Sequence, residues 1–177
     1  DSVFQAVSIG TTSGFLTSNY SNWPLFVPIM LLIAAFIGAC AGSTGGGIKV
    51  IRALILMRQG SSEITKLIHP NAVVTIKFGK RSLDPRVSES VWGFFAVYVA
   101  TFLIILMFLL SQNIDFLSAF SAVGATLNNL GPGLGIVAEN YKDISDGSKL
   151  ALCMAMLLGR LEIFTLLLIF TPSFWRN

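Results

Sequence analysis

Residues 120–133 read FSAVGATLNNLGPG, and residues 4–14 read FQAVSIGTTSG. Each stretch begins with a short apolar segment, too short to cross a bilayer as a helix, and ends in polar residues and glycine. Backbone that leaves a helix at membrane depth is tolerated only where it lines water or is buried in protein. One such stretch alone is more often an ordinary turn, but its repetition predicts two re-entrant pore loops.

Each stretch is followed, at the same distance, by an interruption of a long apolar segment. Gly14 and Ser43 are 29 residues apart in the sequence. The separation of Gly131 and Arg160 is also 29 residues. This matched spacing indicates an internal repeat, and we expect a gate at positions 43 and 160.

The composition is that of an integral membrane protein. The 177 residues are 54% hydrophobic and only 12% charged, and the mean hydropathy is +0.75. Three stretches are apolar enough to span a bilayer: residues 23–41, which can continue past a glycine break to residue 59, residues 91–110 and residues 150–170. Because the chain begins at Asp1, inside the first half-helix, we expect it to be a C-terminal piece of a longer protein.

The distribution of charge predicts the orientation. Residues 49–86 contain eight basic and two acidic residues, whereas residues 112–147 contain four acidic residues and one lysine. By the positive-inside rule the first segment is cytoplasmic and the second is external, so both half-helices enter from the outer side. This topology accounts for the net charge of +3 without a nucleic-acid partner.

The polar residues that end the two stretches are neutral oxygen donors. Residues 11–13 carry hydroxyl groups and residues 128–129 carry amides, and glycine follows each group. Hydroxyl and backbone carbonyl oxygens can replace the hydration shell of an alkali cation, and the C-terminal end of a half-helix favours positive charge. Both stretches therefore predict an ion filter.

A glycine-rich segment, AGSTGGGIK at residues 41–49, interrupts the first long apolar stretch. A phosphate-binding loop is excluded because Ile48 stands where its lysine should be and because a membrane helix precedes the segment. Gly38 and Gly42 form a GxxxG pair, and for Gly38 we accept close helix packing. Residues 43–47 are instead predicted to form a flexible loop within the membrane.

Arg160 lies ten residues into the last apolar stretch. An arginine at that depth costs about 3 kcal/mol unless it faces water or a partner. Glu162 is two residues away and therefore points to nearly the opposite face of a helix. We expect Arg160 to face a pore or residues 43–47, either as an electrostatic barrier or as a packing residue capped by loop carbonyls.

Taken together, these motifs resemble the membrane subunit of bacterial Trk-type potassium uptake systems, in the wider Trk/Ktr/HKT superfamily. The resemblance covers essentially the whole chain and rests on residues 11–15, 42–49, 70–73, 128–133 and 159–162. It implies an all-α membrane protein with repeats of helix, re-entrant pore loop and helix, four of which surround one pore as in potassium channels. Residues 1–89 would be the end of the third repeat and residues 90–177 the fourth.

The resemblance also implies roles for individual residues. The filter would be lined by Thr12, Ser13, Gly14, Asn129, Leu130 and Gly131, and the gate would be formed by Ser43, Thr44, Gly45, Gly46, Gly47 and Arg160. Potassium would be the transported ion, carried by symport, with no organic cofactor. The implied setting is the bacterial cytoplasmic (inner) membrane, in which a multi-pass, lipid-embedded homodimer works with a cytosolic nucleotide-binding regulatory subunit.

Two other functions remain open from the residues alone. A secondary transporter of another small solute would use broken helices at a midplane site, but its repeats would be inverted, whereas these two enter from the same side. A membrane scaffold for a cytosolic regulatory subunit would rest on the basic segment alone. An enzyme is not expected, because no acid, base and nucleophile cluster lies at membrane depth.

Overall fold

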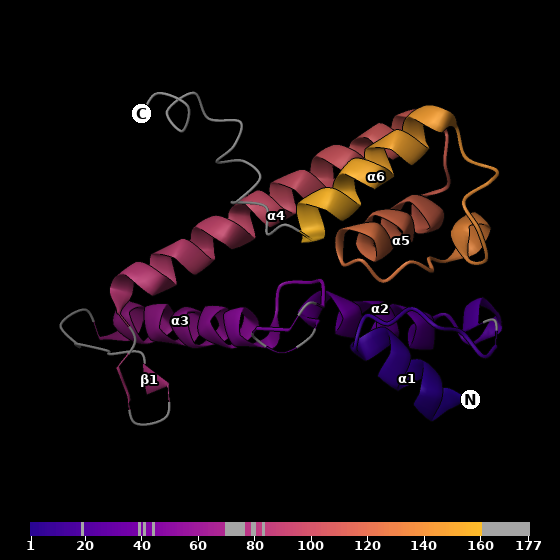
Figure 1. Cartoon of the computed structure of the whole chain (residues 1–177). Coiled ribbons are helices and arrows are strands. Elements are labelled where there is room, and N and C mark those ends of the chain that lie inside the picture. The colour runs from indigo at the N-terminus through magenta and orange to yellow at the C-terminus, as the bar shows by residue number, and fades with distance from the viewer. Residues whose placement is uncertain are drawn as a thin grey trace.

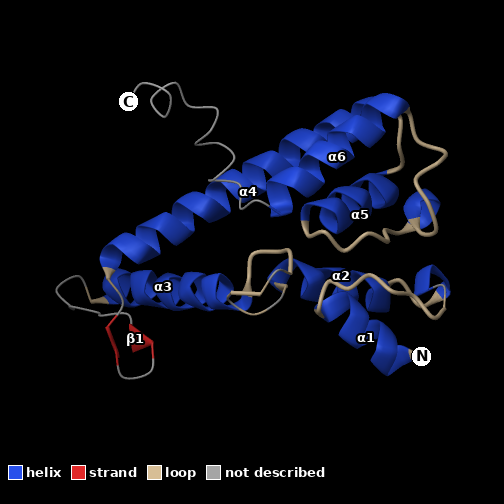
Figure 2. Ribbon diagram, viewed as in Figure 1, coloured by secondary structure: helices blue, strands red, loops and turns tan. Residues whose placement is uncertain are grey.

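The computed structural model describes residues 1–160 apart from residues 19, 39, 41, 44, 70–76, 79, 80 and 83. The described part is helical, with one small antiparallel hairpin (Figures 1 and 2). The α-helices are α1 (Ser2–Gly10), α2 (Phe26–Ile37), α3 (Val50–Ile68), α4 (Pro85–Ser111), α5 (Phe116–Leu127) and α6 (Asp146–Arg160). The short elements are η1 (Tyr20–Asn22), β1 (Lys77–Phe78), β2 (Arg81–Ser82) and η2 (Gly135–Val137).

Helix α4 contains the predicted span at residues 91–110. Asp84 caps it by accepting a hydrogen bond from the backbone N–H of Arg86 at 3.0 Å, and Pro85 occupies the first turn. Its 27 residues extend for about 40 Å at 1.5 Å per residue. Among the described residues, α4 is the one helix long and apolar enough to cross a membrane, and most of its apolar window faces outward.

The predicted span that begins at residue 23 is broken more widely than the glycine pattern indicates. Helix α2 ends at Ile37, because Gly38 adopts a φ of +69°, and α3 begins only after Lys49, with a φ of +70°. Gly38 lies against the backbone of Gly46, so it contributes to packing of the loop rather than to packing between helices. In the last predicted span, α6 runs to Arg160, and residues 161–170 lie outside the described part.

Helix α5 and the start of α6 lie near the C-terminal end of α4, whereas α3 contacts α4 near its other end (Figure 1). Helices α4 and α6 lie side by side, α5 packs on both, and α2 contacts α5 (Figure 1). Three aromatic rings connect α2, α4 and α5. Phe36 of α2 and Phe120 of α5 both pack on Phe102 of α4, with ring centres 5.7 and 5.2 Å away. The hairpin lies near the opposite end of α4 (Figure 2), so the basic and acidic segments are at opposite ends of this helix.

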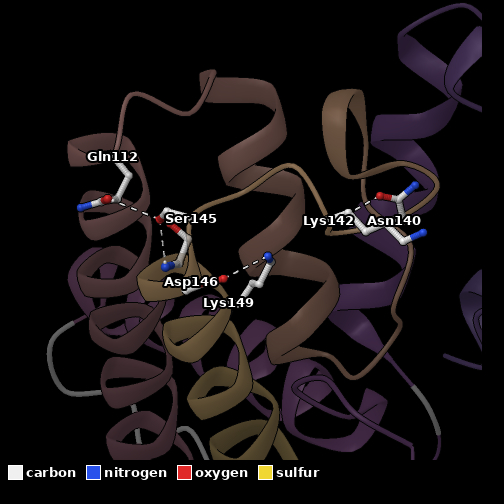
Figure 3. A network of polar contacts seen from close by, with 7 residues as sticks. Gln112, Asn140, Lys142, Ser145, Asp146 and Lys149 are labelled. Atoms are coloured by element: carbon white, nitrogen blue, oxygen red, sulfur yellow. Dashed lines mark hydrogen bonds and ion pairs between the residues drawn. The ribbon is translucent and has the colours of Figure 1, made fainter.

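Polar contacts join the C-terminal end of α4 to the start of α6 (Figure 3). The Ser145 hydroxyl is 3.4 Å from the side-chain oxygen of Gln112, just beyond α4, and accepts from the backbone N–H of Ser148 in α6. Asp146 and Lys149 form an exposed ion pair at 3.2 Å in the first turn of α6. These contacts set how the acidic segment returns to α6.

Helices α1 and α5 end with the same backbone pattern, 117 residues apart. The C-cap residues Thr11 and Asn128 have φ, ψ angles of −91°, 0° and −88°, 0°. After Thr11, the N–H of Thr12 bonds to the third residue back and that of Ser13 to the fifth. Asn129 and Leu130 repeat both bonds, at 3.0 and 2.7 Å. The two turns that follow α1 and α5 therefore have matching backbone geometry.

Candidate ion-conducting site

The residues predicted to line a filter have an unusual backbone in both turns. Thr12 and Gly14 have φ angles of +56° and +77°, and Asn129 and Gly131 have φ angles of +54° and +102°. In each turn the residue between them is not in this left-handed region. This alternation of left-handed and other backbone conformations differs from a β-strand, in which successive side chains point to opposite sides. A positive φ is uncommon for a β-branched residue such as Thr12, so the first turn holds a conformation that costs free energy, whereas Asn129 adopts it more readily.

The two turns lie against each other. The Cα of Gly14 faces the carbonyl group of Leu130 so closely that an added Cβ would overlap the oxygen. The ring of Pro132 lies 3.4 Å from the same Cβ position. Residues 12–14 and 129–131, which are far apart in the sequence, are thus brought together.

All three tyrosines of the chain donate hydrogen bonds to the second turn and the residues that follow it. The Tyr141 hydroxyl donates to the carbonyl oxygen of Gly131 at 2.6 Å. Tyr20, which follows the first turn, donates to the carbonyl oxygen of Gly133 at 2.8 Å and lies 3.3 Å from that of Pro132. Tyr98 of α4 donates to the side-chain oxygen of the fully buried Asn128 at 2.7 Å.

Two of these tyrosines have raised pKa values. Burial raises the pKa of Tyr20 to about 12. Burial also raises the pKa of Tyr141, and the nearby Tyr20 raises it further. Both hydroxyl groups therefore keep their protons, and remain hydrogen-bond donors, throughout the physiological pH range.

Two buried serines hold the loop after the second turn. The Ser121 hydroxyl accepts a hydrogen bond from the backbone N–H of Leu134 at 2.8 Å. The Ser118 hydroxyl accepts from the N–H of Ile136 at 3.1 Å. Both serines lie on α5, so the helix that precedes the turn also supports the chain that follows it.

The predicted gate lies beside the end of α5. Gly46 packs against the backbone carbonyl of Asn128, with no space for a Cβ. On α6, Gly159 packs in the same manner against the carbonyl of Leu127. The Asn129 side-chain amide also donates to a carbonyl of α6, that of Met156, at 3.3 Å. The glycine-rich segment and α6 therefore both touch the backbone that leads into the second turn.

A cavity of about 140 Å³ separates the glycine-rich segment from the end of α6. Ser43 and Arg160, the two residues singled out by the 29-residue spacing, both line it. So do the predicted gate residues Gly45 and Gly47. Thr44 lies outside the described residues, as does Glu162.

Basic residues lie along the same cavity. Lys49 and Arg52 line it together with Arg160, whose side chain is exposed. The guanidinium of Arg52 also stacks on the ring of Phe94 in α4, 4.2 Å from the ring centre, which ties the start of α3 to α4. The described residues contain no group of three or more His, Cys, Asp or Glu side chains that could hold a metal ion.

Sequence reasoning placed the two turns, the glycine-rich segment and Arg160, but it missed the side chains that support them. The supporting residues are Tyr20, Tyr98, Tyr141, Ser118 and Ser121. Tyr20 and its acceptor Gly133 are separated by 113 positions, so no local spacing could have indicated their contact. The one available signal was that the chain contains only three tyrosines.

The fold is that of a cation transporter family. The family model described as TrkH, cation transport protein, matches residues 1–177, and the chain belongs to this family. It is a family of transport proteins and not of enzymes, as the sequence predicted.

Named relatives agree with this assignment. The chain is 56% identical over 175 residues to the Trk system potassium uptake protein TrkH of Vibrio parahaemolyticus and 54% identical over 174 residues to that of Escherichia coli K12. These alignments cover 99% and 98% of this chain but 36% of each relative. The crystal structure of the potassium transporter TrkH from Vibrio parahaemolyticus is similar, with a TM-score of 0.90 over 98% of this chain and 37% of that chain. The resemblance to Trk-type systems inferred from the motifs is confirmed.

Proposed function

We propose that this chain supplies two of the pore loops of a potassium uptake protein. Potassium ions would lose their hydration water to oxygen atoms of residues 12–14 and 129–131 as they pass. The contact between Gly14 and the Leu130 carbonyl carries this proposal, because it brings together two turns with the same left-handed backbone. The names of the relatives support potassium as the ion.

The four-repeat architecture is part of the same proposal. Residues 1–89 would form the end of one repeat, residues 90–177 would form the next, and two more repeats would complete the filter. The equal backbone pattern of α1 and α5 supports this arrangement. Their position at the same end of α4, away from the basic hairpin, supports entry of both loops from the outer side.

We propose that residues 43–47 and Arg160 gate this pathway. The shared cavity supports a gate in which the arginine opposes a cation until the glycine-rich segment moves. Direct contact of Gly46 and Gly159 with the end of α5 would transmit such movement to the filter.

The setting in the cell is likewise a proposal. We propose a multi-pass homodimer in the bacterial cytoplasmic membrane, surrounded by lipid and regulated by a cytosolic nucleotide-binding subunit. The apolar outward face of α4 supports contact with lipid. The basic residues between α3 and α4 offer a cytoplasmic surface for the subunit.

The first test is potassium and sodium uptake by the full-length gene product in potassium-starved bacteria that lack their own uptake systems. We expect Gly131→Ser to lose potassium selectivity, because serine is strained at a φ of +102°. We expect Arg160→Ala to change the flux while selectivity is kept. Unchanged uptake in both variants, at normal abundance in the membrane, would overturn the pore proposal and favour a scaffold.

A further inference from the structure

We propose that Tyr20 and Tyr141 are positioning residues of the filter, whose hydroxyl groups hold the backbone carbonyls of residues 131–133 in the geometry that discriminates potassium from sodium. This inference rests on the proposed function. It assigns to the two side chains a role that neither the motifs nor the spacing of the sequence indicates.

The backbone of Gly131 has a φ of +102°, and an added Cβ would meet no atom within 4 Å. Its N–H makes only a long hydrogen bond, 3.4 Å, to Ala125. Packing at the Cβ position therefore does little to hold Gly131. The hydrogen bond from Tyr141, at 2.6 Å, is short and holds the carbonyl of Gly131 directly.

Tyr20 lies in η1, six residues after Gly14 of the first turn, and only 3% of its surface is exposed. Its hydroxyl donates a hydrogen bond to the carbonyl oxygen of Gly133, which lies in the loop after the second turn. Because the donor and the acceptor come from different repeats, this bond fixes the position of one filter turn relative to the other. The backbone contact between Gly14 and Leu130 also joins the two turns.

The positions of the filter carbonyls decide which ion is selected, whether selection depends on cavity size or on the number and strength of the carbonyl dipoles. A filter whose carbonyls move inward freely can follow the smaller sodium ion. Both tyrosines keep their protons at physiological pH and so restrain this movement under all ordinary conditions.

The test compares Tyr20→Phe and Tyr141→Phe in the full-length gene product, since each change removes one oxygen atom and keeps the ring. Uptake of potassium is measured in potassium-starved cells at increasing sodium, together with abundance in the membrane. We expect each variant to accumulate and to be inhibited by sodium about three- to tenfold more strongly, the size of effect associated with one lost hydrogen bond.

Tyr98→Phe is the matched control. It removes a hydroxyl of α4 that donates to the Asn128 side chain and not to a carbonyl of residues 131–133. We expect a lower melting temperature and a clearly smaller change in the response to sodium than in Tyr20→Phe and Tyr141→Phe. An equal loss of selectivity in this control would assign the effect to general loosening of the loop and overturn the proposal.

A second measurement does not depend on transport. The melting temperature of the purified protein in detergent is recorded in potassium and in sodium chloride, because a bound ion stabilises the folded state by mass action. We expect the wild type to be stabilised more by potassium, and both Phe variants to lose much of this difference.

The outcomes separate the two proposals. If Gly131→Ser alters selectivity while both Phe variants behave as the wild type, the filter is placed correctly and the role of the tyrosines is wrong. If Gly131→Ser also has no effect, the proposed function itself fails. If both Phe variants fail to accumulate, the hydroxyls are needed for folding and the positioning role is overturned.

Discussion

Gly46 packs directly against the carbonyl group of Asn128, so the glycine-rich segment between α2 and α3 touches the end of α5. A Cβ at position 46 would overlap the oxygen and carbon atoms of that carbonyl. Because the acceptor is backbone, it cannot move aside as a flexible side chain would. This contact explains why a glycine is needed here on steric grounds, independently of any flexibility of the segment.

Gly46→Ala should therefore be strongly destabilising. We expect a loss of about 1–3 kcal/mol in the free energy of unfolding, as for other overpacked sites, and a marked loss of uptake. The control is Gly60→Ala on α3, where a Cβ meets nothing within 4 Å and alanine favours the helix. Melting temperatures in detergent and uptake by cells measure both. Equal behaviour of the two variants would contradict the contact.

Gly14→Ala tests the contact between the two turns. The added Cβ would overlap the Leu130 carbonyl, and the φ of +77° is strained for alanine. We expect the turns to move apart, with loss of potassium selectivity in competition uptake. Gly10→Ala, at the end of α1, places its Cβ in open space and should behave as the wild type. Retained selectivity in Gly14→Ala would show that the two turns are not coupled.

Ser121→Ala tests the support of the loop after the second turn. It leaves the buried N–H of Leu134 without its acceptor, which costs about 1–3 kcal/mol. We expect a lower melting temperature in detergent. Ser111→Ala removes an exposed hydroxyl at the end of α4 and should change the melting temperature little. A melting temperature equal to that of the wild type would contradict the role of Ser121.

The tyrosines predict how stability depends on alkaline pH. The folded-state pKa of Tyr20, about 12, lies above the ordinary value of 10.0, so the folded protein holds this proton more tightly than the unfolded chain. The corresponding stability is complete below pH 10 and is lost as the pH rises from 10 to 12. We expect the melting temperature of Tyr20→Phe to fall less steeply over this interval. Identical slopes would place Tyr20 in a solvated environment.

The sequence predicted the parts of the site that have a local signature. The half-helices, the glycines that follow them and the glycine-rich break were all visible, because each depends on the conformations open to a few neighbouring residues. The extent of the break was not visible. Gly38 ends α2 four residues before the apolar pattern ends, because it packs on the backbone of Gly46, a contact made only after the chain turns back.

The register of the repeat is not uniform along the sequence. Phe4 and Phe120 are 116 residues apart, whereas Gly14 and Gly131, like the hydrogen bonds of the two turns, repeat at 117. The sequence by itself determined that the chain is apolar, how its charges divide between two ends, and that a helix-and-glycine unit is used twice. Only the tertiary structure decided that Tyr20 and Tyr141 reach the carbonyls of residues 131–133. Composition and turn conformation are local properties, whereas these contacts join segments that meet only when the helices pack.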